Sequence, residues 1–519
     1  MNLKVRPMGF EAGGIGIVML NKSDAGEMGI GVLERAVLRK NGRTLIAIVD
    51  VAEKFVEKGY VVTNSEVTRF FKFRQGDMVE VVPAEAPESV RYVRQRINGI
   101  RLDRMKMKEI VKDVVERHLS DIELSAFVMS LHDHPLSMDE AEGLSMAMVE
   151  TGKRLKIKGK KICDKHSVGG IPGDKTSMIA VPIIAAAGLT IPKTSSRAIT
   201  SPAGTADRME VIAPVDLGIE EIYKVVKKTN GCLVWGGSLD LAPADDVFIR
   251  IEHPLGVDPL MLPSIMSKKK AVGAKYVVID IPTGRGAKIK TIGSAYSLAS
   301  EFRDLGRRMG MNIACAITFG EQPLGNGIGP ALEAREALQT LEGRGPADVV
   351  EKVVSVVGAL FELTGKSRNI DAGKKLALEI LGSGKALKKM KEIIGAQGGD
   401  PKIRSSDIAL AKRTARIFSK KSGKVLWMKN AEIAMIAKEL GAPQDKKAGI
   451  MLNKKIGDSV KKGELLMTLY AENQRRLGNA AKMAETMEPT IVDESIERRM
   501  LMGVAPDKMI HRKAFMLER

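Results

Sequence analysis

Side chains that bind anions are concentrated in one stretch of the chain, residues 164–177 (DKHSVGGIPGDKTS). The stretch holds three glycines, two lysines, three hydroxyls and a histidine, and the apolar run 178–187 after it predicts a buried helix. Glycines allow turns in which backbone N–H groups approach a ligand, and the N-terminus of a following helix adds partial positive charge. We therefore interpret the stretch as an anion cradle, with phosphate as the expected ligand. The alternative is an ordinary glycine-rich turn with surface lysines.

This cradle differs from the P-loop of nucleoside triphosphatases, which reads G-x-x-x-x-G-K-[ST]. Counting from Gly169, Asp174 stands where the second glycine is required, and Lys175 and Thr176 follow it. A carboxylate at that point would face the phosphates that a P-loop wraps. The sequence therefore disfavours a P-loop enzyme.

Two more polar loops carry the same kind of chemistry. Residues 193–205 (KTSSRAITSPAGT) hold six hydroxyls with an arginine and a lysine, and residues 280–288 (DIPTGRGAK) hold two glycines with Arg285 and Lys288. Hydroxyls donate in fixed directions, and a guanidinium binds two oxygens of a phosphate at once. Unless these are plain polar loops, the three together imply a ligand with more than one phosphate, or a phosphorylated ligand plus free phosphate.

The elements that must position these loops alternate between strand-like and helix-like runs from residue 162 to residue 316. Such alternation predicts a largely parallel sheet covered by helices, with ligands at the carboxyl ends of the strands. Each of the three loops follows a short apolar run of this kind. Residues 245–273 interrupt the alternation, and we expect the chain to return there to a helical domain, so that two domains enclose a cleft.

The fold class expected for the whole chain is multidomain, α/β and α+β, because 519 residues exceed what one core accommodates. We expect an N-terminal small β-barrel (1–85), a helical domain (86–158, with the return segment 245–271), a large mixed α/β domain with the phosphate-binding loops (159–244 and 272–420) and a C-terminal α+β domain (421–519).

Local patterns give finer expectations within the first two domains. In the barrel, the β-prone run 67–73 predicts a strand and 51–58 predicts an inserted helix. In the helical domain, Ser120 with Glu123 and Ser137 with Glu140 fit the capping box that begins a helix. His132 and His134 are interpreted as part of a turn between helices, because no further metal-ligand spacing accompanies them.

Composition narrows the class of ligand and the compartment. No run of about 18 apolar residues occurs, and the N-terminus lacks an apolar signal segment, so we expect a cytoplasmic protein without membrane contact. Three scattered cysteines, 163, 232 and 315, favour buried thiols over a disulfide framework or zinc site. The net charge of +19 favours an anionic partner, and only 4% aromatic residues favours small phosphorylated ligands over nucleic acid.

Five motifs in this order resemble the thymidine/pyrimidine-nucleoside phosphorylase family: 164–170 (DKHSVGG), 195–197 (SSR), 204–210 (GTADRME), 241–245 (LAPAD) and 264–269 (SIMSKK). The resemblance runs from about residue 89 to near the C-terminus. The extra N-terminal β domain and residues 196–201 (SRAITS) resemble the archaeal-type branch. The resemblance implies cleavage of AMP or another nucleoside 5′-monophosphate by inorganic phosphate, which gives free base and ribose 1,5-bisphosphate. CMP and UMP are the expected further substrates.

The resemblance also implies roles for individual residues. It implies that inorganic phosphate is held by Lys165, Ser167, Ser177, Ser195 and Thr205. It implies that the nucleotide is contacted by Gly170, Ser196, Arg197, Ala198, Ile199, Thr200, Ser201, Thr205, Ser264 and Lys288, with Asp258 as proton donor. No cofactor or metal is implied, and members form homodimers through the helical domain, to which the barrel is expected to add larger assemblies.

The sequence departs from the nucleoside-cleaving members at two points. Pro172 is one residue extra between Gly170 and Gly173, and the arginine that recognises a pyrimidine has no match near Arg250 and Glu252. Both departures favour the nucleotide branch.

The chemistry implied is cleavage of the C1′–N bond through an oxocarbenium-like state, which needs phosphate beneath C1′ and neutralisation of the leaving base. Asp258 is the expected proton donor if burial or an anionic neighbour keeps it protonated. His166 is the rival donor, and a helix-capping role before Pro259 is the alternative for Asp258. A nucleoside phosphorylase and a non-catalytic phosphorylated-ligand or RNA-binding protein remain alternative functions. The hydroxyl-rich loops and few aromatic residues favour the enzyme.

Overall fold

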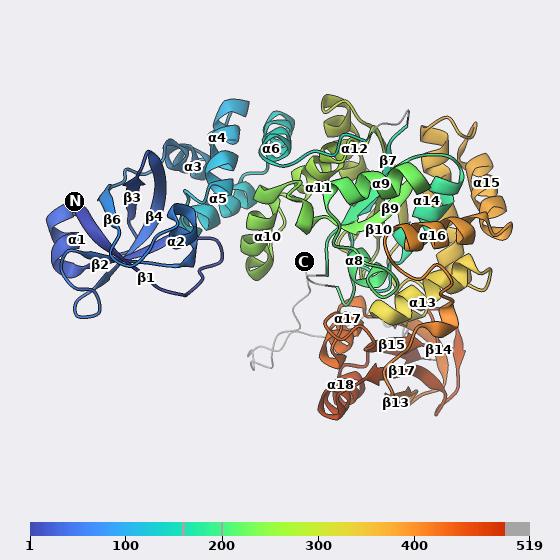
Figure 1. The fold of residues 1–519 in the computed structure, drawn as a ribbon. Helices are drawn as coiled ribbons and strands as arrows, with labels where there is room; N and C mark the ends of the chain where they lie inside the picture. Colours follow the sequence, from blue (N-terminus) through green and yellow to red (C-terminus); the bar gives the residue numbers. More distant parts are fainter. Residues whose placement is uncertain (158–160, 199–200, 494–519) are drawn as a thin grey trace, which may run out of the picture.

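The computed structural model describes residues 1–157, 161–198 and 201–493 of the chain. From the N-terminus it contains a β-barrel, a group of helices, a parallel sheet covered by helices, and a C-terminal α+β part (Figure 1). The multidomain α/β and α+β class expected from the sequence is therefore observed. Within the described residues, no helix is long and apolar enough to cross a membrane.

The N-terminal strands close into a barrel with the order β1-β5-β2-β4-β3-β6. Side chains alternate between the buried interior and the surface along β1 and β6, as a half-buried sheet requires. Two short helices cover the barrel, and all of its elements have these bounds: β1 Asn2–Pro7, β2 Ile17–Asn21, α1 Lys22–Met28, β3 Arg35–Lys40, β4 Arg43–Ala52, β5 Tyr60–Thr63, α2 Ser65–Phe71 and β6 Met78–Pro83.

Two local expectations in the barrel are wrong. The run 67–73, expected as a strand, belongs mostly to helix α2, because the Asn64 side chain accepts the Val67 N–H at 3.2 Å and caps the helix. Val67 and Phe71 then bury one face of that helix in the barrel core. The run 51–58, expected as a helix, instead ends strand β4 and continues as bends to the turn at Gly59.

The helical domain combines two separated parts of the chain. Both expected capping boxes are present, at Ser120 with Glu123 and at Ser137 with Glu140. The expected return to this domain is also observed, since Phe248 packs on Phe127 with ring centroids 5.9 Å apart. The helices are α3 Glu88–Ile97, α4 Arg104–Val115, α5 Asp121–Asp133, α6 Met138–Thr151, α10 Pro243–Leu255 and α11 Met261–Ala271. His134 caps the end of α5 and so begins the expected turn between helices, whereas His132 lies inside the last turn of α5.

The central sheet is parallel, with the orders β11-β10-β7 and β8-β9, and a parallel bridge between Ile162 and Thr190 joins the two groups. All carboxyl ends therefore lie at one edge. Its strands are β7 Cys163–Ser167, β8 Ile191–Ser195, β9 Gly231–Trp235, β10 Tyr276–Thr283 and β11 Asn312–Phe319. The helices of this part are α7 Thr176–Ala186, α8 Thr205–Met209, α9 Ile219–Thr229, α12 Ile292–Arg308, α13 Pro330–Leu341, α14 Ala347–Leu363, α15 Ile370–Gly382 and α16 Lys385–Ala396.

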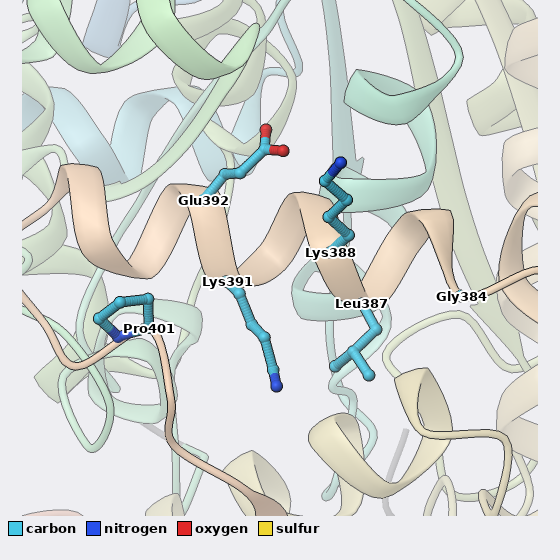
Figure 2. Close-up of a pocket in the computed structure, with 6 residues that line it drawn as sticks. All are labelled: Gly384, Leu387, Lys388, Lys391, Glu392 and Pro401. Atoms are coloured by element: carbon cyan, nitrogen blue, oxygen red, sulfur yellow. The ribbon is translucent and has the colours of Figure 1, made fainter.

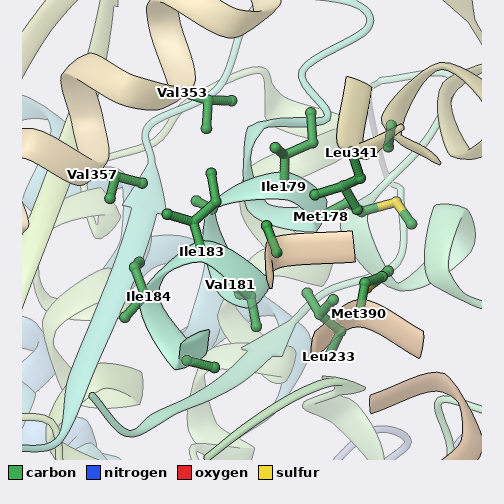
Figure 3. Packing of buried hydrophobic residues seen from close by; sticks show 14 of the residues in the cluster. Met178, Ile179, Val181, Ile183, Ile184, Leu233, Leu341, Val353, Val357 and Met390 are labelled. Atoms are coloured by element: carbon green, nitrogen blue, oxygen red, sulfur yellow. The ribbon is translucent and has the colours of Figure 1, made fainter. Parts of the chain in front are cut away.

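Helix α16 has one surface side and one core side. Its Leu387, Lys388 and Lys391 line a surface hollow together with Pro401 (Figure 2). Its Met390 points the other way, into an apolar core built around helix α7 (Figure 3). Helix α7 is buried along nearly its whole length, as its apolar sequence predicts, and this packing fixes the N-terminal end that faces the cradle.

The C-terminal part is a small α+β unit joined to the central part by strand pairing. Strand β12 (Gly327–Ile328) pairs antiparallel with β15 (Gly449–Leu452), and Asn430 donates to the carbonyl oxygens of Gly286 and Gly320 at 3.2 and 3.0 Å. The remaining elements are β13 Arg413–Phe418, β14 Gly423–Met428, α17 Asn430–Leu440, β16 Ser459–Val460, β17 Leu465–Ala471, α18 Gln474–Met487 and β18 Thr490–Asp493. The expected C-terminal domain extends into residues 494–519, which lie outside the described residues.

Candidate active site

The three polar loops expected from the sequence follow strands β7, β8 and β10 and therefore emerge at the same edge of the parallel sheet. Two of them touch at Gly170. This residue has φ of 92°, and a Cβ atom there would lie 2.6 Å from the backbone nitrogen of Lys288. Only glycine permits this approach without a shift of the backbone. The first loop thus brings its backbone directly against the loop that carries Lys288.

The residues expected to hold inorganic phosphate sit at strand ends and in first helical turns. Lys165 and Ser167 belong to β7, Ser195 ends β8, Ser177 lies in the first turn of α7, and Thr205 begins α8. Helix α7 adds the partial positive charge of its N-terminus beside Ser177. The positions suit an oxyanion, because short hydroxyls on fixed backbone donate in defined directions.

Lys175 does not reach this group. Its ammonium is fully buried and donates to the carbonyl oxygens of Leu324 and Gly327 at 2.9 and 3.1 Å, and it also pairs with Glu336. It therefore ties the cradle to helix α13 rather than binding a phosphate as a P-loop lysine does. The burial of Lys175 also argues against a turn with surface lysines.

Two lysines and two aspartates form a buried cluster beneath the cradle. Lys165 Nζ lies 3.6 Å from Asp280 Oδ2, and Lys352 Nζ lies 3.0 Å from the same oxygen. Asp174 completes the cluster, with its Oδ2 at 3.5 Å from Lys352 Nζ and 4.0 Å from Lys165 Nζ. Burial alone would raise the pKa of Asp174, but Lys165 and Lys352 outweigh it and hold that pKa well below its usual value. Asp174 is therefore ionised, and Lys165 shares the two aspartates with a second cation.

A second buried group surrounds His166. Asp164 accepts from Lys269 Nζ at 2.7 Å and has Lys193 Nζ at 3.7 Å. Burial, opposed by Asp164 and reinforced by Lys269, lowers the pKa of Lys193 to about 7. Burial together with Lys269, Lys193 and two more lysines lowers the pKa of His166 well below its usual value. His166 is thus a neutral imidazole at pH 7, which holds no imidazolium proton to donate.

Asp258 lies in the turn between α10 and α11 and reaches across to the central part of the molecule. Its Oδ2 is 2.8 Å from Lys288 Nζ, which joins the expected proton donor to an expected nucleotide contact. Close by in α10, burial and the charge of Asp258 raise the pKa of Glu252 to about 7. Ser264 lies in the α11 helix that follows the turn. Asp258 and Lys288 thus connect the helical domain to the central part at this turn.

Acidic side chains bind the described residues of the loop after β8. Arg197 forms two hydrogen bonds to Glu210, at 2.7 and 2.5 Å, and its guanidinium lies 4.9 Å from the Trp235 ring. Arg197 is the main reason that the pKa of Glu210 falls to about 2. Asp207 Oδ2 accepts the N–H of Ala198 at 2.7 Å. Arg197 is thus occupied by Glu210 rather than directed freely at a ligand.

The structure describes only some of the other residues of this loop that are expected to contact the nucleotide. Ser196 begins the loop after β8, and Ser201 donates to the Ala203 carbonyl at 3.2 Å. Ile199 and Thr200, also expected to contact the nucleotide, lie outside the described residues.

Sequence reasoning missed Lys352 and Glu252 as members of this region. Lys352 has one signal in the sequence, because it is the lone lysine in the valine-rich run VVEKVVSVV of helix α14. In the sequence, Glu252 is notable only because a pyrimidine-recognising arginine has no match near it. The contacts of Asn430 and Lys446 with loops of the central part also went unpredicted, because more than 100 residues separate the partners in sequence.

Comparison with known proteins agrees with this architecture. Family models match residues 90–152 (glycosyl transferase family, helical bundle domain), 159–387 (glycosyl transferase family, a/b domain) and 425–489 (pyrimidine nucleoside phosphorylase C-terminal domain). The solved anthranilate phosphoribosyltransferase of Thermus thermophilus shares the fold, with a TM-score of 0.51 and 19% identity over 59% of this chain and 98% of its own. The family models thus define the class of protein as a glycosyl transferase, with a helical bundle domain and an a/b domain.

Relatives that match over nearly their whole length identify the family within this class of protein. The AMP phosphorylase of Thermofilum pendens is 45% identical over 502 residues, 97% of each chain. Those of Thermococcus sibiricus and Pyrococcus furiosus are 47% and 46% identical, over 96% and 95% of this chain and 99% and 98% of their own. The chain belongs to the AMP phosphorylase family, which confirms the resemblance inferred from the sequence motifs.

Proposed function

We propose that the protein catalyses phosphorolysis of AMP, giving adenine and ribose 1,5-bisphosphate. The observation that carries this proposal is the meeting of a phosphate cradle at Gly170, a basic loop at Lys288 and a carboxyl at Asp258. Phosphorolysis needs these three parts: a site for the attacking phosphate, a site for the nucleotide's own phosphate, and an acid for the leaving base. Membership in the AMP phosphorylase family supports the choice of AMP, and CMP and UMP are proposed as further substrates.

In this proposal, inorganic phosphate binds at Lys165, Ser167, Ser177, Ser195 and Thr205. One of its oxygens attacks C1′ of the ribose while the C1′–N bond breaks and its electron pair stays on the base nitrogen. Lys165 and the α7 N-terminus hold the phosphate charge in place, so that positioning and electrostatics supply most of the rate enhancement. The nucleotide lies against Gly170, Lys288, Ser264 and the loop 196–201.

Asp258 is proposed as the group that protonates the departing base. His166 is disfavoured in this role, since burial and nearby lysines keep its pKa low and its imidazole neutral. Asp258 reaches instead the loop that carries Lys288, an expected nucleotide contact. The alternative of a helix-capping residue is weaker, because Asp258 Oδ2 pairs with Lys288 and no cap hydrogen bond from its side chain to α11 is described.

The proposal predicts base release that requires AMP and phosphate together. Adenine release is measured by chromatography from AMP and from adenosine, each with and without phosphate. Release from AMP only when phosphate is present supports the proposal. Faster release from adenosine than from AMP would instead indicate a nucleoside phosphorylase, and binding without any release would indicate a phosphorylated-ligand binding protein. The oligomer is proposed to be at least a homodimer, which mass measurement in solution tests.

A further inference from the structure

Glu252 holds the turn that carries Asp258 at both of its ends. Its side-chain Oε1 accepts the N–H of Leu260 at 3.1 Å, and its own carbonyl oxygen accepts the N–H of Val257 at 3.2 Å and that of Gly256. Asp258 lies between these two attachment points. A single residue of helix α10 thus fixes the backbone on either side of the expected proton donor.

The Glu252 carboxyl is buried, whereas Asp258 is about half exposed and turned towards the central part of the molecule. The charged groups that act on Glu252 are Asp258, Asp245 and Lys288, and Asp245 is itself paired with Lys268 at 2.7 Å. Lys288 is in turn held by Asp258. The charge around Glu252 is therefore negative on balance, which disfavours the ionised form of its buried carboxyl.

Resting on the proposed phosphorolysis, we propose that Glu252 is a positioning residue for Asp258, which fixes its turn and keeps one proton on the Glu252–Asp258 carboxyl pair. During the reaction Glu252 passes its proton to Asp258, the C1′–N bond breaks with its electron pair left on the base nitrogen, and that nitrogen takes the proton from Asp258. The pair regains a proton from solvent after the base leaves. Glu252, the buried member of the pair, holds the proton near neutral pH. This agrees with its pKa of about 7, which results from burial and from the charge of Asp258.

Glu252→Gln separates the two parts of this role, because an amide oxygen still accepts the Leu260 N–H while the titratable group is gone. We expect its kcat for AMP to fall by roughly 100-fold, the usual scale of general acid–base catalysis, with KM for AMP within about threefold. In the wild type, kcat falls as pH rises through about 7, where the pair loses its proton. In Glu252→Gln this fall near pH 7 is expected to be absent.

The matched control is Glu342→Gln, because Glu342 also accepts a backbone N–H, that of Ser405 at 3.0 Å, but lies away from Asp258. It is expected to keep the wild-type kcat and pH profile. A Glu252→Gln enzyme with wild-type kcat and the same fall near pH 7 contradicts the positioning role while leaving phosphorolysis intact. A wild type that releases no adenine from AMP with phosphate overturns the proposed function itself.

A second measurement does not depend on turnover or on the stability of the variant. Infrared spectroscopy of the wild-type protein detects protonated carboxylic acids, and the proposal predicts one such signal that disappears as pH rises through about 7. The signal is expected to persist in Glu342→Gln. A wild-type spectrum without that titrating signal contradicts the proposal even if Glu252→Gln fails to fold.

Discussion

Lys288 Nζ lies 2.8 Å from Asp258 Oδ2, so one ion pair joins the loop after β10 to the turn between α10 and α11. Both side chains are about half exposed, at 45% and 44%, and such a pair contributes little to stability. Its significance is chemical. The Lys288 ammonium occupies an oxygen of the carboxyl that is proposed to donate a proton. A nucleotide phosphate that attracts Lys288 would release Asp258, so that recognition of the 5′-phosphate and readiness of the acid are coupled.

This coupling predicts that Lys288→Ala loses the preference for nucleotides. Hydrogen bonds to charged groups contribute about 1.5–3 kcal/mol, so KM for AMP is expected to rise roughly 10-fold to 100-fold. Cleavage of adenosine is expected to change little, because adenosine has no 5′-phosphate. Steady-state kinetics with both substrates measures the effect, and Lys290→Ala, an exposed lysine two residues away, is the control. Equal losses on AMP and adenosine would argue against the assignment.

Lys352 is expected to keep Lys165 available for phosphate by neutralising Asp174 and Asp280. In Lys352→Met only Lys165 remains to balance two buried carboxylates, so we expect KM for phosphate to rise about 10-fold. Removing one member of a buried ion group also costs about 3–5 kcal/mol of unfolding free energy. Urea unfolding and phosphate kinetics measure the two effects. Asp280→Asn added to Lys352→Met is expected to recover part of the stability, and no recovery would count against the cluster.

Asn430 is expected to support the Lys288 loop from the C-terminal part of the chain. Asn430→Ala removes the donor from the Gly286 and Gly320 carbonyls, and buried carbonyls left unpaired cost about 1–3 kcal/mol. We expect a lower unfolding free energy and a several-fold higher KM for AMP. Asn479→Ala, which removes an exposed contact to Glu439, is the control. If both variants bind AMP like the wild type, the C-terminal part does not support this loop.

The lowered pKa of the buried Lys193 predicts that the stability of the protein depends on pH. Burial lowers its pKa to about 7 in the folded protein from an ordinary value of 10.5. Between these values the unfolded chain binds one more proton, so the unfolding free energy rises with pH, by at most about 1.4 kcal/mol per pH unit. Lys193→Met is expected to remove this rise. Urea unfolding at pH 7 and pH 9 compares wild type, Lys193→Met and the exposed control Lys224→Met, and equal increments in all three would refute the assignment.

The general plan of the site was predictable from the sequence because each polar loop directly follows an apolar strand-like run. Parallel strands then bring the ends of those runs to one edge, as Ser167 and Ser195 illustrate. The return of residues 245–271 to the helical domain was also predictable, since the strand–helix alternation stops there.

The structure differs from the sequence-based predictions where tertiary packing outweighs the local sequence pattern. The β-branched and aromatic residues around Val67 favour a strand by propensity, but the Asn64 cap and burial against the barrel make a helix. Lys352 reaches Asp280 from 72 residues away in the chain, and no spacing rule connects them. The pairing of Lys288 with Asp258 likewise depends on how two domains are juxtaposed.

The most direct test of the account follows the attacking phosphate itself. AMP is incubated with ³²P-labelled inorganic phosphate, and adenine and the sugar product are quantified together. Phosphorolysis predicts one labelled phosphate in ribose 1,5-bisphosphate for each adenine released, because the phosphate oxygen becomes bonded to C1′. Adenine released together with unlabelled ribose 5-phosphate would show hydrolysis and contradict the account.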